Sequence, residues 1–316
     1  MSELRYHPFL GQWVITATQR QDRTFHPPAD FCPLCPTRPS AFPTEIPFDD
    51  YDIVVFENKF PSLQRNPPEP AVGGQVRKSE GACEVVCYSS DHHATFATLP
   101  LSQIRKLMRV WRERTCELSE RPEVEYVFIF ENKGREIGVT LSHPHGQIYA
   151  YPFIPPVLGI ELENEKVHFE STGRSLFDDW LSAESADREV CRNESFVAMV
   201  PFFARYPYEV HVVATSEIPS LRKTSDAELD HLAAILHEVA QRLDGLFGFS
   251  MPYVMAVHQE PAVPGYEFTR LHVEFYPPYR TADKLKYLAG SEAGAGAFIN
   301  DTLPEESAAR LRAVTL

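Results

Sequence analysis

The chain has 316 residues, of which 43% are hydrophobic, and a sequence of this length can bury one large core or two coupled ones. Its 44 acidic and 30 basic side chains give a formal net charge of −14, which argues against general nucleic-acid binding because phosphate backbones attract a basic surface. The first residues lack the pattern of a secretory leader, and no stretch has the roughly 20 apolar residues of a membrane span, so we expect a cytoplasmic protein without a membrane partner.

Short runs rich in β-branched and aromatic residues predict strands in the first half of the chain, at 51–58, 84–88, 124–132 and 146–153. Between the second and third of these runs, apolar residues such as Ile104, Leu107 and Trp111 recur at helical spacing within 101–118. The first half therefore reads strand, strand, helix, strand, strand.

The second half repeats this order. Its predicted strands lie at 195–202, 209–215, 253–259 and 270–276. The predicted helix between them, 225–243, begins with a capping box formed by Ser225 and Glu228. A short last helix is predicted within 303–314, with Pro304 in its first turn.

The two halves also match in spacing. From Val85 to His143 is 58 residues, and from Val210 to His272 is 62. Although this order of elements is common in α+β folds, we interpret the match as a duplication that gives two related halves, 1–170 and 171–316.

The stretch LSHPHGQIYA places polar side chains at every second position, namely His143, His145 and Gln147. Side chains alternate between the faces of a strand, so all three project from one side if this stretch is extended. Histidine can act as a neutral nucleophile or as a proton shuttle near pH 7, because its pKa lies there. The alternative is a hydrogen-bonded strand end without chemistry, but two histidines and an amide at this spacing favour a reactive site.

HPHGQIYA resembles the active-site motif of the galactose-1-phosphate uridylyltransferase family, which belongs to the histidine-triad superfamily. Other segments resemble parts of that family in the same order along nearly the whole chain: LGQWVITATQRQDR, FCPLC, VVFENKFPSL, CYSSDHH, FENKGREIGV, VPFFARYPYEV and RLHVEFYPP. The resemblance implies a duplicated histidine-triad-like α+β fold, in which a mostly antiparallel sheet forms a half-barrel with flanking helices. It also implies a nucleotidyltransferase of galactose metabolism that works as a homodimer.

In that family the second histidine of the motif is the nucleophile, and this role falls on His145. The resemblance implies that His145 takes UMP from UDP-glucose as a uridylyl-histidine and then gives it to galactose 1-phosphate, in a ping-pong double displacement. Gln147 stands where related hydrolases carry a third histidine, which can protonate a poor leaving group. A sugar phosphate leaves as a stable anion, so an amide that hydrogen-bonds the phosphoryl oxygens suffices and favours transfer over hydrolysis.

The FCPLC stretch gives Cys32 and Cys35 the C-x-x-C spacing of zinc sites. A redox pair is the alternative, although the flanking prolines and the lack of a helix start after the motif argue against it. The resemblance supplies His92 and His143 as further ligands and so implies a closed, structural zinc site; the neighbouring His93 could replace His92. The chain has 6 cysteines, and only this pair has a recognised short spacing, which suits a reducing cytosol.

Members of the family also carry a second metal, often iron, bound by one glutamate and three histidines. Carried over position by position, these ligands fall on Glu161, His258, His272 and Glu274. The last of them departs from the pattern, because glutamate stands where the family has histidine. A carboxylate shifts the preference toward harder divalent ions, and Fe²⁺ and Zn²⁺ are the candidates. A salt-bridged, metal-free remnant of the duplicated motif is the alternative.

The resemblance also implies substrate contacts. Guanidinium groups, amides and turn donors suit nucleotide phosphates, and these contacts fall on Arg20, Arg23, Asn58, Lys59, Asn132, Gly138, Val139 and Thr140. Contacts to the hexose, often made across a subunit boundary, fall on Lys286, Tyr287 and Glu292. The GAGAFIND stretch near Phe298 departs from the family pattern, which has a glutamine about there.

Two other functions stay open at the level of the sequence. One is a different nucleotidyltransferase or phosphorylase of the same superfamily, acting on a dinucleoside polyphosphate or on another nucleotide sugar. The other is a zinc-stabilised nucleotide-binding module without catalysis. Such a module needs no nucleophile, so the joint presence of His145 and Gln147 argues against it.

Overall fold

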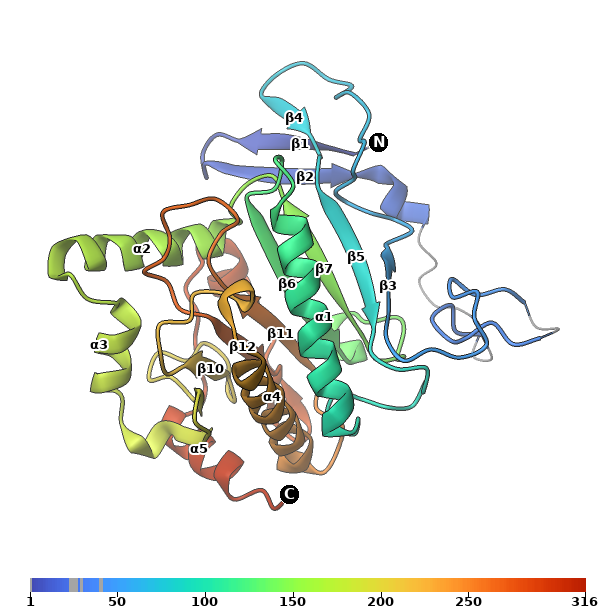
Figure 1. Cartoon of the computed structure of the whole chain (residues 1–316). Helices are drawn as coiled ribbons and strands as arrows, with labels where there is room; N and C mark the ends of the chain where they lie inside the picture. The colour runs from blue at the N-terminus through green and yellow to red at the C-terminus, as the bar shows by residue number, and fades with distance from the viewer. Residues whose placement is uncertain (1, 23–27, 29–30, 40–41) are drawn as a thin grey trace.

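The computed structural model describes the chain except for residues 1, 23–27, 29–30 and 40–41 (Figure 1). Its strands are β1 Ser2–His7, β2 Gln12–Ala17, β3 Val54–Glu57, β4 Val76–Lys78, β5 Ala82–Cys87, β6 Tyr126–Lys133, β7 His145–Tyr151, β8 Glu189–Arg192, β9 Phe196–Met199, β10 Val210–Ala214, β11 Tyr253–His258, β12 His272–Tyr276, β13 Tyr279–Thr281 and β14 Lys284–Leu285. Its α-helices are α1 Leu101–Ser119, α2 Pro156–Thr172, α3 Leu176–Ala183, α4 Asp226–Phe247 and α5 Pro304–Arg312. None of the helices in these described ranges combines the length and apolar content needed to cross a bilayer.

Within the described residues, nine strands pair antiparallel in one open sheet, in the order β3-β5-β7-β6-β11-β12-β10-β9-β8. The eight predicted strands correspond to β3, β5, β6, β7 and β9 to β12, and the predicted α+β class is confirmed. Outward from the central pair β6 and β11, the order is β7, β5, β3 on one side and β12, β10, β9 on the other. Each half of the chain therefore builds its part of the sheet in the same way.

The registers of the two halves agree as well. Cys87 of β5 pairs with His145 of β7, and His211 of β10 pairs with Glu274 of β12. His145 and Glu274 thus occupy equivalent places in the two halves of the sheet.

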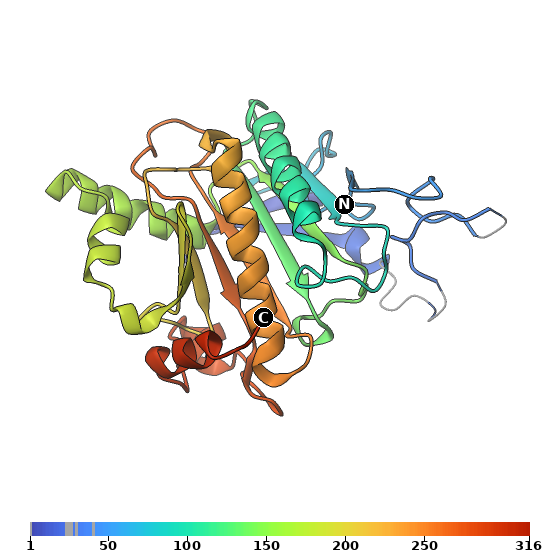
Figure 2. The same ribbon diagram turned by 60° about the horizontal axis from the view of Figure 1, so that its bottom comes forward.

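One face of the sheet is covered by α1 and α4, which lie side by side across it (Figure 2). Both helices are amphipathic, and their buried stripes include Leu107 and Trp111 of α1 and Leu236 of α4. The predicted capping box is present at the start of α4: the Ser225 hydroxyl accepts from the backbone N–H of Glu228 at 3.2 Å. The helices bury the strand residues that face them, among them Ile148 and Ala150 of β7.

The opposite face of the sheet carries the polar residues of interest. Because side chains alternate along a strand, burying Ile148 and Ala150 under the helices turns His145, Gln147 and Tyr149 to the other side. The same alternation buries Val257 of β11 and Val273 and Phe275 of β12, so His258, His272 and Glu274 also turn to that side. One sheet face therefore holds the candidate active site on β7 and the candidate second metal site on β11 and β12.

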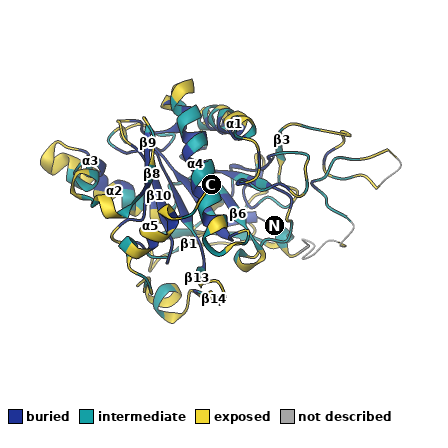
Figure 3. Ribbon diagram, turned by 90° about the horizontal axis from the view of Figure 1, so that it is seen from below, coloured by how far each residue is buried: buried dark blue, intermediate teal, exposed yellow. Residues whose placement is uncertain are grey.

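Several elements lack a clear sequence signal. A small sheet in the order β2-β1-β4 lies beside the main sheet, and α2 begins next to the β1–β2 turn of this small sheet, with α3 following it (Figure 1). The residues of α2 show no single apolar stripe, because Val157 and Ile160 are exposed while Leu158 and Leu162 are buried. Figure 3 shows α2 and α3 with much of their surface exposed at the edge of the molecule.

Candidate active site and metal centres

The HPHGQ motif lies where a bend enters strand β7. The strand begins at His145, while His143 and Pro144 form the bend before it. The predicted alternation on one strand face therefore holds for His145 and Gln147, but His143 lies outside the strand. This bend divides the motif into two parts, because His143 contacts the cysteine-bearing loop while the strand presents the other two residues.

The glycine of the motif is required by close packing on the helix-covered face. A Cβ atom at Gly146 would lie 2.2 Å from the hydroxyl of Tyr88 and 3.1 Å from the carbonyl oxygen of Phe130. The Tyr88 side chain is fully buried, so it has little room to move. A residue without a side chain at this position lets β7 pack tightly while His145 and Gln147 face the open side.

His145 is held in one tautomer. Its Nδ1 lies 2.7 Å from the carbonyl oxygen of His143 and donates a hydrogen bond to it. Nε2 is then the nitrogen that carries the lone pair, and it is the nucleophilic atom of the ring. The side chain is half-buried at the start of β7, so it is fixed in position yet accessible to a substrate.

Gln147 is oriented by two neighbours that point donors at its carbonyl oxygen. Its Oε1 lies 3.5 Å from Nδ2 of Asn58 and 3.4 Å from the hydroxyl of Tyr149. The Tyr149 hydroxyl also lies 3.5 Å from the guanidinium of Arg20. These contacts turn the amide nitrogen of Gln147 away from its neighbours, as a donor for a bound anion.

Tyr149 and Tyr51 are site residues that the sequence interpretation missed. Tyr149 could have been found from the strand alternation, since it is two residues beyond Gln147 on the same face. Burial raises the pKa of Tyr149, so the phenol stays protonated and can donate. Tyr51, whose hydroxyl lies 2.6 Å from Nε2 of His143, comes from the loop before β3 and has no local sequence signal.

The other predicted nucleotide contacts are only partly brought together. Asn58 follows β3 and reaches Gln147, while exposed Lys59 pairs with Glu45 at 3.0 Å. Asn132 lies on β6, on the same face as Gln147 by the alternation that buries Ile129 and Glu131. The turn Gly138-Val139-Thr140 precedes the motif, with Gly138 at a φ of 85°. Arg23 lies outside the described residues.

The predicted hexose contacts lie in the other half of the chain. Lys286 is buried and pairs with Glu292 at 3.2 Å, while Tyr287 is 75% exposed. Their segment packs against the loop before β10, where the rings of Phe298 and Tyr206 are 5.9 Å apart. The predicted hexose contacts thus lie on the segment that packs beside the loop before β10.

The four predicted zinc ligands are brought together beside the start of β7. The potential ligand atoms of Cys32, Cys35, His92 and His143 all lie within 4.8 Å of one another. Sγ of Cys35 is 3.4 Å from Nδ1 of His92 and 3.6 Å from Nδ1 of His143. Zinc bonds of 2.0–2.3 Å at tetrahedral angles separate such ligands by about 3.5 Å, so the residues fit a zinc ion. His92, not His93, belongs to this group.

The surroundings of this cluster also suit a metal. Nε2 of His143 donates to the carbonyl of Ser89 at 2.8 Å, which leaves Nδ1 as the ligand atom. Burial lowers the pKa of His143 to about 4, so the ring is neutral, as a ligand must be. Burial and the neighbouring Cys32 raise the pKa of Cys35 to about 12, so two thiolates here need a cation beside them.

The second predicted set is also brought together, on β11, β12 and α2. Glu161, His258, His272 and Glu274 have potential ligand atoms within 4.8 Å of one another. Oε2 of Glu161 lies 2.8 Å from Nδ1 of His258, and Nε2 of His272 lies 3.7 Å from both carboxylates. Nδ1 of His272 donates to the carbonyl of Arg270 at 2.8 Å, so its Nε2 faces the cluster. Two imidazoles and two carboxylates make a donor set that fits a divalent cation.

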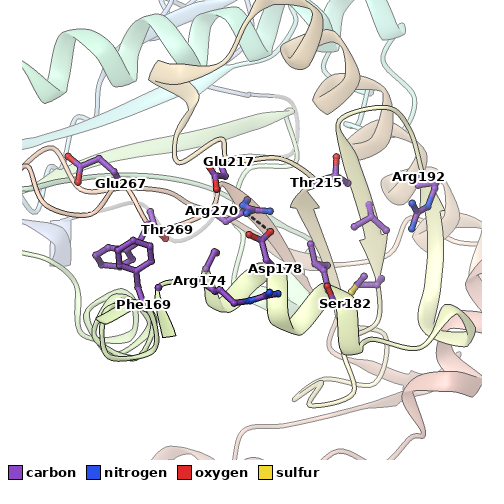
Figure 4. Close-up of a pocket in the computed structure, with 16 residues that line it drawn as sticks. Phe169, Arg174, Asp178, Ser182, Arg192, Thr215, Glu217, Glu267, Thr269 and Arg270 are labelled. Atoms are coloured by element: carbon purple, nitrogen blue, oxygen red, sulfur yellow. Dashed lines mark hydrogen bonds and ion pairs between the residues drawn. The ribbon is translucent and has the colours of Figure 1, made fainter. Parts of the chain in front are cut away.

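A cavity of about 980 Å³ lies elsewhere, bordered by α3, the strands β8 and β9 and the loop that precedes β12 (Figure 4). Its charged side chains balance: Arg174, Arg192 and Arg270 face Asp178, Glu217 and Glu267. Arg270 is paired with Asp178 at 2.7 Å, as the dashed line in Figure 4 shows. Neither His145 nor Gln147 lines this cavity, and its balanced charge does not favour a nucleotide diphosphate, so it is not the candidate active site.

Comparison with known proteins agrees with this geometry. Residues 1–155 match the family model of the N-terminal domain of galactose-1-phosphate uridyl transferase, and residues 161–316 match that of its C-terminal domain. A galactose-1-phosphate uridylyltransferase of Thermotoga maritima is 41% identical over 99% of this chain and 98% of its own length. One of Streptomyces lividans is 40% identical over 99% of this chain and 87% of its own length.

Among solved structures, a uridylyltransferase superimposes with a TM-score of 0.89 at 34% identity. The alignment covers 99% of this chain and 98% of that one. Sequence and fold therefore match along both halves of the chain, including the strand that carries the histidines. On these matches, the chain belongs to the galactose-1-phosphate uridylyltransferase family.

Proposed function

We propose that the protein is a galactose-1-phosphate uridylyltransferase that moves UMP from UDP-glucose to galactose 1-phosphate and releases glucose 1-phosphate and UDP-galactose. The observation that carries this proposal is the fixed tautomer of His145, whose Nδ1 donates to the carbonyl of His143. A neutral imidazole with an oriented Nε2 is the nucleophile that such a transfer needs, and Gln147 stands beside it on the same strand face.

In the first half-reaction, Nε2 of His145 attacks the α-phosphorus of UDP-glucose. The N–P bond forms as the bond from this phosphorus to the glucose 1-phosphate oxygen breaks, and glucose 1-phosphate leaves as an anion. A phosphate oxygen of galactose 1-phosphate then attacks the same phosphorus, and the N–P bond breaks to restore neutral His145. Positive charge develops on the ring during the attack, and the hydrogen bond from Nδ1 to the His143 carbonyl stabilises it.

Gln147 and Arg20 stabilise the phosphoryl group in this proposal. The Gln147 amide nitrogen donates to a phosphoryl oxygen, while Asn58 and Tyr149 hold its carbonyl oxygen. Arg20 lies beside Tyr149 and offers its guanidinium to the diphosphate. The remaining nucleotide contacts are assigned to Arg23, Lys59, Asn132 and the turn at 138–140, and the hexose contacts to Lys286, Tyr287 and Glu292.

We propose a structural zinc at Cys32, Cys35, His92 and His143. It would tie the loop around 32–35 to the bend that precedes His145, and so fix the carbonyl to which His145 donates. We propose a second divalent ion, Fe²⁺ or Zn²⁺, at Glu161, His258, His272 and Glu274, where it would neutralise the buried carboxylate of Glu274 and the half-buried carboxylate of Glu161. Both ions would act on the structure of the sheet and not on the transferred group.

We also propose two halves, 1–170 with the catalytic strand and 171–316 with the second cluster, in a cytosolic homodimer. Apolar side chains on α2 and the β1–β2 turn support a dimer, since Ile160 is 63% exposed and Phe9 is 93% exposed. The zinc-binding thiols suit a reducing compartment. Light scattering after size exclusion should give twice the mass of one chain, and a monomer would contradict the dimer.

The proposed reaction is tested with UDP-glucose labelled at the α-phosphorus. The protein should acquire label that is stable to base and labile to acid, as expected of a phosphoramidate on histidine, and His145→Gly should acquire none. Galactose 1-phosphate should then remove the label as UDP-galactose, while water and ADP should not. Release by ADP or inorganic phosphate would instead identify a phosphorylase-type reaction, and label in His145→Gly would contradict the mechanism.

A further inference from the structure

His211 is a buried histidine that neither the proposed reaction nor the four-residue second cluster uses. It lies on β10, directly opposite Glu274 of β12 in the strand register, and it is 5% exposed. We propose that His211 is a positioning residue for the second metal: it holds the Glu274 carboxylate in the orientation in which it binds the ion. This inference rests on the metal that the proposed function places at that cluster.

The contacts of His211 place it outside the metal-binding group and against one of its members. Nε2 of His211 donates a hydrogen bond to Oε1 of Glu209 at 2.8 Å and forms an ion pair with Oε1 of Glu274 at 3.2 Å. The four cluster residues have ligand atoms within 4.8 Å of one another, and His211 is not a member of that set. His211 therefore acts on the ion through Glu274.

The contacts of Glu274 show how this orientation is fixed. Its Oε1 faces His211 at 3.2 Å and Nε2 of His272 at 3.7 Å. Its Oε2 faces the guanidinium of Arg205 at 3.4 Å and Nε2 of His258 at 3.7 Å. Each oxygen thus meets one imidazole of the cluster and one group outside it. Replacing a residue that holds a metal ligand in this way typically weakens metal binding by roughly 10–100-fold.

Glu209 holds His211 in turn. Its side chain is fully buried, and its Oε2 accepts from the backbone N–H groups of Arg205 and Tyr206 at 2.7 and 2.9 Å. Oε1 is then directed at His211. The network runs from the backbone through Glu209 and His211 to Glu274, and all three of these side chains are buried.

The experiment measures Mn²⁺ binding to metal-stripped protein that has first received a single equivalent of zinc, which the thiolates of the cysteine site bind in preference. The electron paramagnetic resonance signal of free Mn²⁺ gives the amount bound. Mn²⁺ prefers carboxylate and imidazole ligands to thiolates, so it reports on the second cluster. Wild type should bind about one Mn²⁺ per chain, because each chain has one such set of four ligands. His211→Leu should bind Mn²⁺ about 10–100-fold more weakly. His211→Gln, whose amide can still donate to Glu274, should recover most of the affinity.

His231→Leu is the matched control. His231 is a half-buried histidine outside the cluster, and its Nδ1 lies 2.8 Å from the hydroxyl of Ser195. This variant should bind Mn²⁺ as wild type does. Unchanged affinity in His211→Leu would overturn the inference, and so would a loss in His211→Gln or in His231→Leu as large as the loss in His211→Leu. No binding by wild type would overturn the proposed second metal, and with it this inference, while the labelling of His145 would still test the reaction separately.

Discussion

At the scale of single residues, the candidate active site depends on how neighbours orient a few polar atoms. The Tyr149 hydroxyl lies between the carbonyl oxygen of Gln147 and the guanidinium of Arg20. It therefore helps to decide which end of the Gln147 amide faces a phosphoryl group. This contact was not predicted from the motif, because Tyr149 reads as an ordinary aromatic strand residue.

Tyr149→Phe should slow the transfer of label to His145 about fivefold, the effect expected from losing one neutral hydrogen bond of about 1 kcal/mol. The packing of the ring is kept, so the free energy of unfolding should change little. Rapid-quench labelling at saturating UDP-glucose measures the rate. Tyr151→Phe, two residues further along the same strand face, is the control, and an equal effect of both substitutions would contradict the role of Tyr149.

The glycine of the motif gives a prediction about stability. Gly146→Ala should lower the free energy of unfolding by about 1–3 kcal/mol, because the new Cβ would lie 2.2 Å from the Tyr88 hydroxyl. Adding Tyr88→Phe should restore part of the loss, since it removes the closest atom. Urea unfolding of the single and double variants measures this. Gly159→Ala on α2, where the Cβ meets its nearest neighbour at 3.8 Å, should not destabilise the protein.

At the scale of elements, the zinc cluster joins a loop with little regular structure to the start of β7. Cys32→Ser should lose zinc and lower the melting temperature, because the remaining ligands cannot hold the loop against the strand. The main effect of the substitution should be on stability, and the extent of His145 labelling should be affected to a smaller degree. Elemental analysis and thermal unfolding test this, with Cys116→Ser on α1 as the control. A Cys32→Ser protein with full zinc content and an unchanged melting temperature would contradict the structural role.

Strand β6 carries a carboxylate into the helix-covered core. Burial raises the pKa of Glu131 to about 7, above the value of an unfolded chain. The folded state therefore holds this proton at a pH where the unfolded state has released it, and stability falls as the pH rises from about 4.5 to 7. Glu131→Gln removes this cost, so its free energy of unfolding relative to wild type should be about 2 kcal/mol higher at pH 8 than at pH 5.

Urea unfolding of both proteins at the two pH values measures the difference. Glu57→Gln, at an exposed position on the edge strand β3, is the control and should follow wild type at both pH values. A Glu131→Gln protein whose stability relative to wild type is the same at pH 5 and pH 8 would contradict the assignment.

At the scale of the whole molecule, all the described strands of the main sheet except β8 followed from local pattern. Runs of β-branched and aromatic residues gave β3, β5, β6, β7 and β9 to β12, and helical spacing gave α1 and α4, because these elements bury a regular face. The helix α2 escaped prediction because it exposes Val157 and Ile160 as well as burying Leu158. Its apolar residues do not form a stripe.

The candidate site was accessible to sequence only where its residues share a motif or a resemblance. His145 and Gln147 lie in one strand, whereas the partners near Gln147 come from distant segments: Asn58 follows β3, and Arg20 lies in the short 3-10 helix Thr18–Asp22 after β2. His211 likewise gains its meaning only from pairing across the sheet with Glu274. Such contacts depend on strand order and register, which no local pattern specifies.

The central claim is that Nε2 of His145 carries the UMP group during transfer. The most direct test is to incubate the protein with UDP-glucose alone, digest it at neutral or basic pH, and locate the adduct by tandem mass spectrometry, with ³¹P magnetic resonance of the intact protein to assign the nitrogen. We expect UMP on His145, attached at Nε2 and released by galactose 1-phosphate. An adduct on another residue, attachment at Nδ1, or turnover without any adduct would contradict it.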